Sequence, residues 1–435
     1  MEKLYRHYLH STGICTDSRK VEKGCLFFAL RGERFDGNRY ALQALEAGAS
    51  FAVVDDSSLP QDERLIRVKD SLWAMQQLAR HHRRQFDIPV LAVTGTNGKT
   101  TTKELCAAVL SKFYRLHYTR GNFNNHIGLP LTILSMPRDT EFLLLEMGAN
   151  HAGEIEALCR IAEPDFGLIT NVGMAHLEGF GSFEGVKQTK SELYRFLAER
   201  DGLAFVNLDE PHLQELLPAG LKTFTYSSKK PGADVFVRCI EAHGSLRLAF
   251  EEQGQWHEVE MALSGEYNFR NAMTAVAVGL FFSRRSAVAT EKAAENITRA
   301  LEGYRPRMNR SQWVEREGRF YFLDAYNANP VSMRLALEDF AKAKGAFKVA
   351  VLGEMLELGV YSEQAHEALL AQALRLPLDR IVCVGEGFAK AAKAAGLPWF
   401  AHAGEVKAWL QQQSLPPQSR IFLKGSRKVA LEGVL

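Results

Sequence analysis

The sequence is poor in cysteine and contains no two cysteines at a C-x-x-C spacing. Its six cysteines, among 435 residues, are scattered at positions 15, 25, 106, 159, 239 and 383. This distribution argues against a zinc site or a disulfide framework, and it fits a reducing compartment. We therefore expect a cytoplasmic protein whose cores are stable without covalent cross-links.

Long hydrophobic runs and an excess of one charge are also missing. The longest largely apolar stretch, residues 273–282, is about half as long as a membrane span requires. The first ten residues carry charges and aromatics where a signal peptide needs an apolar segment. Basic residues total 53 against 51 acidic ones, a net charge of +2, so the chain has no overall attraction for nucleic acid or an anionic membrane. We expect neither of them as a partner.

Short apolar runs that alternate with helical patterns indicate an α/β fold. The runs are apolar on both faces, as parallel strands covered by helices are, and they span residues 90–95, 141–148, 166–173, 348–355, 380–387 and 420–426. The length predicts about three domains, which we place at 1–87, 88–305 and 306–435. The alternating segment 223–262 predicts a small β insertion in the middle domain.

The most specific motif is Gly95-Thr96-Asn97-Gly98-Lys99-Thr100-Thr101. It follows a buried strand pattern, and it precedes a segment in which Leu105, Val109 and Phe113 recur every four residues, as on one helix face. A strand, a glycine-rich turn, Lys-Thr and a helix together form the context of a P-loop. The usual spacing would place a further glycine where the sequence has Val93, so this loop is a shortened variant.

A P-loop predicts a nucleotide phosphate site. Backbone N–H groups and the positive end of the helix dipole bind phosphate oxygens. Lys99 would reach the β- and γ-phosphates, and Thr100 would offer its hydroxyl to Mg²⁺. Glu146 ends a buried strand run, where P-loop proteins hold Mg²⁺; taken alone, a glutamate there is more often a cap or a solvated edge.

Further segments resemble the Mur ligases, ATP-dependent amide-forming enzymes of bacterial cell-wall synthesis. They are GTNGKTT (95–101), TRGNFNNHIGLP (119–130), EMGANHAGEI (146–155), TNVGMAHLEGFGS (170–182), KSELY (190–194) and GEYNFRNAMTA (265–275). They follow in the family's order, and the resemblance extends through all three domains. It implies an N-terminal α/β domain for a UDP-sugar, a central parallel-sheet ATPase domain, and a C-terminal Rossmann-like domain that binds the acceptor and closes on ATP about a hinge near 303–307.

The last domain resembles the branch of the family that joins D-alanyl-D-alanine to UDP-N-acetylmuramoyl-tripeptide. The segments concerned are AYNANPVSM (325–333), LGEMLELGVYSEQAH (352–366) and LKGSRKVALE (423–432). The resemblance implies that ATP phosphorylates the tripeptide carboxylate and that the amine of the dipeptide attacks the acyl phosphate. We expect a monomer that acts on these small molecules.

The resemblance also implies the roles of individual residues. It makes Lys99, His176 and Lys190 catalytic, and it makes Thr100, Glu146, His176 and Lys190 the side chains at two Mg²⁺ sites, with Lys190 carbamylated. Without the resemblance, Lys190 would be read as a solvated helix residue. It implies that the nucleotide is bound by Asn268, Asn271, Arg310 and Asp324. It implies that the substrates are bound by Ser18, Arg19, Asn125, Tyr326, Asn327 and Asn329. Tyr267 stands where the family more often has histidine.

Two other classes of function stay open at this point. A related amide ligase, such as a folylpolyglutamate synthetase, would share the P-loop and Lys190 but should lack the YNANP segment and the Asp-Ser-Arg segment at 17–19. A nucleotide-dependent switch for guanine would need an N-K-x-D motif, which the sequence lacks.

Overall fold

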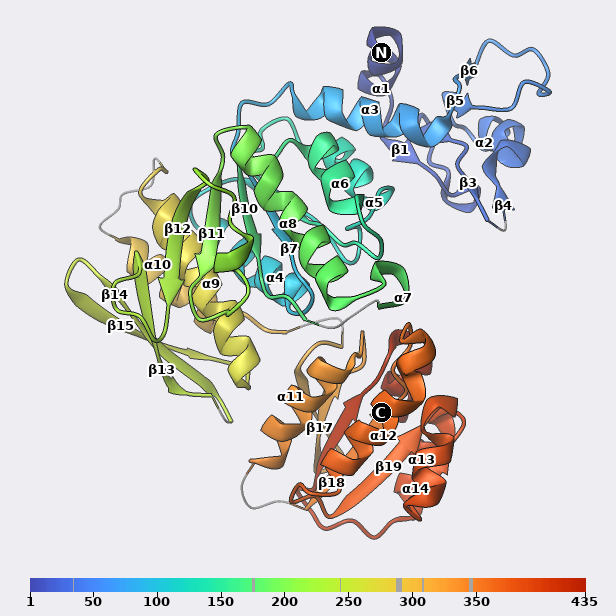
Figure 1. Cartoon of the computed structure of the whole chain (residues 1–435). Coiled ribbons are helices and arrows are strands. Elements are labelled where there is room, and N and C mark those ends of the chain that lie inside the picture. The colour runs from blue at the N-terminus through green and yellow to red at the C-terminus, as the bar shows by residue number, and fades with distance from the viewer. Residues whose placement is uncertain (34, 174–176, 243, 287–291, 307–308, 344–346) are drawn as a thin grey trace.

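Within the residues that the computed structural model describes, three larger β-sheets follow one another along the chain, each packed with helices (Figure 1). The described residues are 1–33, 35–173, 177–242, 244–286, 292–306, 309–343 and 347–435. The three-part α/β architecture expected from the sequence is therefore confirmed.

The N-terminal sheet is parallel and has the strand order β1-β2-β5-β6. Its strands are β1 (Ile14–Cys15), β2 (Leu26–Phe28), β5 (Phe51–Val54) and β6 (Leu65–Arg67), while β3 (Arg31–Gly32) and β4 (Phe35–Asp36) form a separate hairpin. The helices of this region are α1 (Glu2–Leu9), α2 (Ala41–Glu46) and α3 (Ser71–Arg83). Asp70 caps α3 by accepting a hydrogen bond from the amide of Trp73 at 2.8 Å.

The central sheet has the order β15-β14-β13-β12-β11-β10-β7-β9-β8. The strands from β8 to β13 pair in parallel, whereas β14 and β15 are antiparallel. The strands are β7 (Val90–Thr94), β8 (Leu116–Tyr118), β9 (Phe142–Glu146), β10 (Phe166–Ile169), β11 (Leu203–Asn207), β12 (Lys222–Ser227), β13 (Val235–Glu241), β14 (Leu246–Glu252) and β15 (Gln255–Met261). The segment expected as a β insertion thus continues the edge of this sheet.

Helices cover both faces of the central sheet around β7 and β9, which explains why these two strands are apolar on both faces. Val90 and Ala92 of β7 face one core, and the alternate residues Leu91 and Val93 face another. Helices α5, α6 and α8 contribute to the first core and α4, α9 and α10 to the second. The helices are α4 (Lys99–Leu110), α5 (Gly128–Leu134), α6 (Glu154–Ala162), α7 (Leu177–Phe180), α8 (Phe183–Glu199), α9 (Glu266–Ser283) and α10 (Ala293–Glu302).

The C-terminal sheet has the order β16-β17-β21-β18-β19-β20, in which only β16 is antiparallel among the described strands. Its strands are β16 (Gln312–Arg316), β17 (Arg319–Asp324), β18 (Lys348–Gly353), β19 (Arg380–Val384), β20 (Trp399–Phe400) and β21 (Arg420–Lys424). Its helices are α11 (Pro330–Ala341), α12 (Ser362–Ala373), α13 (Ala389–Ala394) and α14 (Ala403–Gln412).

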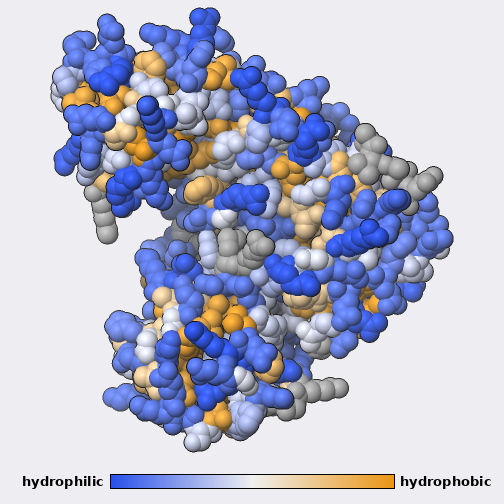
Figure 2. Space-filling view, turned by 180° about the vertical axis from the view of Figure 1, so that it is seen from behind, coloured by the Kyte–Doolittle hydropathy of each residue, from blue (hydrophilic) through white to orange (hydrophobic). Residues whose placement is uncertain are grey.

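The N-terminal and central regions share one hydrophobic core, whereas the C-terminal region has cores of its own. Leu26 and Leu78 belong to the same cluster as Leu129 and Ile133 of α5. The C-terminal clusters form around α11 and α12 on one face and α14 on the other. Figure 2 shows a hollow in the surface between the C-terminal and N-terminal regions.

Glu163 links α3 to the end of α6 through hydrogen bonds from two arginines. It ends α6 in a left-handed conformation, with φ of 46°, and its side chain is 8% exposed. Its carboxylate accepts hydrogen bonds from the guanidinium of Arg80 at 2.9 Å and from that of Arg84 at 2.6 Å. Burial acts to raise the pKa of Glu163, but the hydrogen bonds from Arg84 and Arg80 outweigh it and lower the pKa to about 2.

We predict that Glu163→Gln lowers the free energy of unfolding at pH 7 by about 2 kcal/mol, the usual worth of hydrogen bonds to a charged group. Because the pKa of Glu163 is lower in the folded state, its contribution is complete above the ordinary value near 4.5 and is lost as the pH falls toward about 2. Urea unfolding should show the two proteins converging as the pH falls from about 5 to about 2. Glu199→Gln, on an exposed residue, is the matched control, and an equal loss there would contradict the assignment.

Candidate active site

The P-loop lies between the end of β7 at Thr94 and the start of α4 at Lys99, as predicted. Gly98 has φ of 78°, and a Cβ there would lie 2.5 Å from Oδ1 of Asn271. Gly95 has φ of 139°, and a Cβ there would collide with Oγ1 of Thr170. Both positions therefore require glycine, because of the backbone angle and because of the close neighbour.

The helix after the loop is one turn shorter than the periodicity suggests. Leu105 and Val109 lie on α4 and are fully buried, but the helix ends at Leu110. Phe113 therefore follows the helix, although its side chain is buried against the same core.

The loop is held by hydrogen bonds to the turn after β10. The Asn97 amide donates to Oδ1 of Asn171 at 3.0 Å, and the carbonyl of Asn97 accepts from Oγ1 of Thr170 at 2.7 Å. The ammonium of Lys99 turns back and donates to the carbonyls of Gly95 and Thr96 at 2.8 and 3.0 Å. Burial, followed by the charge of Arg310, lowers the pKa of Lys99 against the opposing effect of Glu146.

Glu146 emerges beside the loop because β7 and β9 pair in parallel with Val93 opposite Glu146. Its side chain is 2% exposed. Oε1 accepts from Oγ1 of Thr100 at 3.1 Å and from Nδ2 of Asn124 at 2.7 Å, while Oε2 is buried without a hydrogen-bond partner. A buried carboxylate oxygen left unpaired beside a threonine hydroxyl suits Mg²⁺, which prefers oxygen ligands.

Lys190 lies on α8, and its side chain is buried rather than solvated, with 2% of the residue exposed. Its Nζ lies 5.4 Å from the centre of the Phe180 ring. Burial, followed by the positive charge of Lys99, lowers the pKa of Lys190 to about 7, although Glu192 and Glu154 act in the opposite direction. A large fraction of this amine is therefore neutral, and hence nucleophilic, near neutral pH.

The start of α9 carries two buried asparagines and a tyrosine, and Asn271 lies against Gly98 of the P-loop. Oδ1 of Asn271 accepts from Oγ1 of Thr102 at 3.0 Å, and Nδ2 of Asn268 donates to the carbonyl of Ser264 at 2.7 Å. The hydroxyl of Tyr267 lies 3.3 Å from Oγ of Ser311, and its ring packs against the C-terminal core. Burial raises the pKa of Tyr267, so its hydroxyl is neutral.

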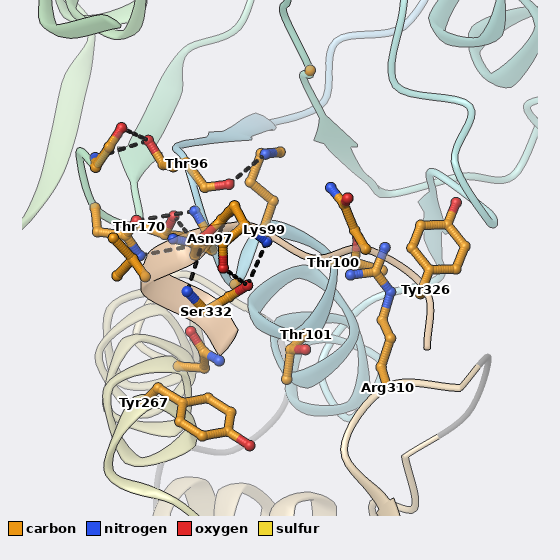
Figure 3. Close-up of a pocket in the computed structure, with 18 of the residues that line it drawn as sticks. Thr96, Asn97, Lys99, Thr100, Thr101, Thr170, Tyr267, Arg310, Tyr326 and Ser332 are labelled. Atoms are coloured by element: carbon orange, nitrogen blue, oxygen red, sulfur yellow. Dashed lines mark hydrogen bonds between the residues drawn. The ribbon is translucent and has the colours of Figure 1, made fainter. Parts of the chain in front are cut away.

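The C-terminal region contributes two arginines that flank Tyr326. The guanidinium of Arg310 lies 3.9 Å from the centre of the Tyr326 ring, and that of Arg427 lies 5.8 Å from it. Nε of Arg310 is buried without a hydrogen-bond partner. Figure 3 shows Arg310 and Tyr326 side by side next to α4, with Tyr267 in the lower part of the view.

The neighbouring polar residues of this region are held by local contacts. Oδ2 of Asp324 accepts from the ammonium of Lys424 at 2.5 Å, and that ammonium also donates to the carbonyl of Asn327 at 3.3 Å. Oδ1 of Asn327 accepts from the amide of Ala328 at 2.9 Å.

Asn329 connects the C-terminal region directly to the P-loop. Its Oδ1 caps α11 by accepting from the amide of Ser332 at 2.8 Å, and its Nδ2 donates to Oδ1 of Asn97 at 2.7 Å. Ser332 and Asn97 accordingly lie close together in Figure 3.

These groups surround a cavity of about 820 Å³ between the central and C-terminal regions. The predicted site residues in its lining are Thr96, Asn97, Gly98, Lys99, Thr100, Thr101, Asn125, Glu146, Asn268, Asn271, Arg310, Asp324, Tyr326, Asn327 and Asn329. Gly95 and Lys190 are not part of the lining. Ser18 and Arg19 lie apart from it in a short turn of the N-terminal region, where Arg19 pairs with Asp17 at 2.8 Å. His176 falls outside the described residues.

Sequence reasoning singled out Asn125 and missed its neighbour Asn124. Oδ1 of Asn125 accepts from the amides of Ile127 and Gly128 at the start of α5, whereas Asn124 contacts Glu146. The signal that was missed is the doubled asparagine itself, because both Asn124 and Asn125 line the cavity. Lys103 was also missed; it lies one helical turn after Lys99, and its side chain is fully buried.

The fold and the cavity define the chain as a P-loop nucleotide-binding protein of the α/β class, with a site completed by a separate C-terminal region. Family models match nearly the whole chain: the Mur ligase family catalytic domain at residues 10–83, the Mur ligase middle domain at 93–279, and the Mur ligase glutamate ligase domain at 309–427.

Similar proteins agree with these matches. The UDP-N-acetylmuramoyl-tripeptide–D-alanyl-D-alanine ligase of Bacillus subtilis is 38% identical, over 97% of this chain and 92% of that protein. The crystal structure of MurF from Acinetobacter baumannii is 31% identical, with a TM-score of 0.87 over 100% of this chain and 97% of the other. MurF from Thermotoga maritima, solved in complex with ADP, is 28% identical, with a TM-score of 0.85 over 98% and 96%. The chain belongs to the Mur ligase family.

Proposed function

We propose that this protein is the ATP-dependent ligase that joins D-alanyl-D-alanine to UDP-N-acetylmuramoyl-tripeptide in peptidoglycan synthesis. The observation that carries the proposal is the cavity, because one space is lined by the P-loop, by Glu146, and by Arg310, Asp324 and Tyr326 of the C-terminal region. The likeness to the Bacillus subtilis ligase supports the choice of substrates, since it covers almost the whole of both chains.

The reaction must make a carboxylate reactive, because oxide is too poor a leaving group for an amine to displace. ATP would transfer its γ-phosphoryl group to the tripeptide carboxylate and leave as ADP. The amine of the dipeptide would attack the carbonyl carbon of this acyl phosphate, lose a proton, and expel phosphate. The protein must therefore hold several negatively charged oxygens close together and exclude water.

The residues of the loop are arranged for the first of these tasks. The ammonium of Lys99 donates its hydrogen bonds to two carbonyls of its own loop. Phosphate oxygens would be stronger acceptors for the same ammonium. Arg310 faces the loop from the C-terminal side with a buried Nε that lacks a partner. Both cations would bind the phosphates, so that nucleotide would draw the two regions together.

The residues present fit Mg²⁺. Thr100 and the unpaired oxygen of Glu146 would hold it at the P-loop, and among the described residues no cluster of three or more His, Cys, Asp or Glu side chains offers a full protein shell. Nucleotide phosphates would supply the remaining ligands, as is common for Mg²⁺. When bound, the cation would neutralise phosphate charge. The family resemblance implies a second Mg²⁺ held by carbamylated Lys190 and by His176.

Lys190 fits the carbamate implied by the family resemblance. Its neutral amine would attack CO2, forming an N–C bond and releasing a proton, and the amine would become an anionic, carboxylate-like carbamate. A buried amine with a pKa of about 7 is suited to this reaction, because an ordinary lysine is almost wholly protonated at that pH.

We also propose roles for the three domains. Residues 1–87 would hold the UDP-sugar, with Ser18 and Arg19 at the uridine. Residues 88–305 would bind ATP, and 306–435 would bind the dipeptide and close about 303–307. We propose a cytoplasmic monomer that serves cell shape and division. No described helix is long and apolar enough to cross a membrane.

Phosphate release from ATP tests the proposed activity. We predict rapid release only when UDP-N-acetylmuramoyl-tripeptide and D-alanyl-D-alanine are both present, with at least about tenfold less with either alone, because the acyl phosphate is consumed by the amine. Malachite green detection measures the phosphate, and mass spectrometry measures the pentapeptide product. Full activity with single amino acids, or with folate and glutamate, would refute the substrate assignment.

Lys190→Ala tests the carbamate. We predict that this variant loses at least about 99% of the synthetic rate, since an anionic group at the site is lost, and that millimolar short-chain carboxylic acids restore part of it. Lys187→Ala, on the same helix, is the control and should keep most of the rate in either medium. Undiminished activity of Lys190→Ala would contradict the role.

A further inference from the structure

The fully buried lysine on α4, Lys103, is not explained by the P-loop. It lies four residues after Lys99, and its side chain is 0% exposed. Removing a lysine ammonium from water is costly unless other groups compensate for the charge. The groups that contact the Lys103 ammonium therefore indicate the function of this residue.

The ammonium of Lys103 has three oxygen neighbours. It donates to the carbonyl of Thr119 at 2.8 Å, and it lies 2.8 Å from Oε1 of Glu104. The third neighbour is Oε2 of Glu146, at 3.8 Å. The first two contacts hold the ammonium in place, and the third points it at the carboxylate of the proposed metal site.

The distance between Nζ of Lys103 and Oε2 of Glu146 shows what kind of contact the two side chains make. At 3.8 Å the two charges attract each other, but the separation is too long for a hydrogen bond. Oε2 is the oxygen of Glu146 that has no hydrogen-bond partner, while Oε1 is occupied by Thr100 and Asn124. The lysine thus balances the buried charge and leaves the lone pairs of Oε2 available.

The backbone of Glu146 is tied to the same point. Its amide donates to Oγ1 of Thr119 at 3.0 Å, and Thr119 is the residue whose carbonyl accepts from Lys103. Lys103 therefore fixes Glu146 in two ways, through Thr119 and through the attraction between the side-chain charges.

We propose that Lys103 is a positioning residue that orients the Glu146 carboxylate, with Oε2 presented to a divalent cation bound with the nucleotide. The proposal rests on the metal role proposed for Glu146. Lys103 is not among the residues that line the cavity, so its effect on the cation would pass through Glu146.

Mn²⁺ binding in the presence of saturating ADP tests this, with free Mn²⁺ measured by electron paramagnetic resonance at pH 7.5. The variants are Lys103→Gln, Glu146→Gln and the double variant. Glutamine at 103 can still donate to Thr119 but carries no charge, and Lys103→Met is the second uncharged variant if the first does not fold. Lys112→Met is the control, because Lys112 is exposed just after α4.

We expect Lys103→Gln to weaken Mn²⁺ binding by about tenfold, as is usual when a residue supporting a metal ligand is lost. Glu146→Gln should weaken it at least as much, and the double variant no more than Glu146→Gln alone. Binding of ADP in EDTA should stay within about twofold for Lys103→Gln, and Lys112→Met should match the unaltered protein in both measurements.

Unchanged or tighter Mn²⁺ binding by Lys103→Gln would overturn the proposal. Additive losses in the double variant would do so too, as would an equal loss of metal-free ADP binding, because Lys103 would then act on the loop and not through Glu146. If Glu146→Gln itself binds Mn²⁺ normally, the metal role proposed for Glu146 has failed. If only Lys103→Gln binds it normally, the failure is confined to the inference about Lys103.

Discussion

The parallel register between β7 and β9 is the constraint on which the site depends. Val93 pairs with Glu146, so the carboxylate emerges at the edge of the sheet where the P-loop turns into α4. On the other side of β7, Thr94 pairs with Ile169, which brings the Thr170–Asn171 turn under the loop. A shift of one residue in either pairing would turn these side chains to the opposite face.

Burying that carboxylate has consequences for its surroundings. Thr100 and Asn124 bind one of its oxygens, and Lys103 faces the other. A buried charge is tolerated only with such partners. The polar contacts around Glu146 therefore serve the fold as well as the chemistry, and they explain why a lysine is enclosed in the interior one turn beyond the phosphate-binding one.

The packing divides the protein into two parts. The N-terminal and central regions form one unit, and the C-terminal region is joined to that unit by fewer contacts. The N-terminal and central regions share a core and are clamped by Glu163, while the C-terminal region has separate cores. It meets the central region through small contacts, such as Asn329 with Asn97 and Tyr267 with Ser311. These contacts lie at the cavity, so whatever fills the cavity acts directly on the join between the regions.

Much of this arrangement was predictable from the sequence, because the motifs specify local geometry. The P-loop turn follows from glycines at positions that exclude a Cβ, and the parallel sheets follow from strands that are apolar on both faces. Side-chain direction was harder to predict. Asn124 and Asn125 are indistinguishable by type, and the helical pattern that includes Phe113 does not reveal that α4 ends at Leu110.

The environments of Lys103 and Lys190 were likewise beyond the sequence. Read by residue type, Lys190 belongs on a solvated helix face, yet α8 buries it. Lys103 is enclosed because β8 leads into Thr119 over the side of α4, and this contact depends on residues 16 positions apart. Only the tertiary structure brings those oxygens to the ammonium.

The transfer of oxygen from the tripeptide carboxylate to phosphate tests most directly whether the carboxylate is activated as an acyl phosphate. UDP-N-acetylmuramoyl-tripeptide labelled with ¹⁸O in both oxygens of the reacting carboxylate would be converted with ATP and D-alanyl-D-alanine, and the products analysed by mass spectrometry. We predict one ¹⁸O in each phosphate released and one retained in the new amide. Unlabelled phosphate, formed at the same rate as the pentapeptide, would contradict activation of the carboxylate through an acyl phosphate.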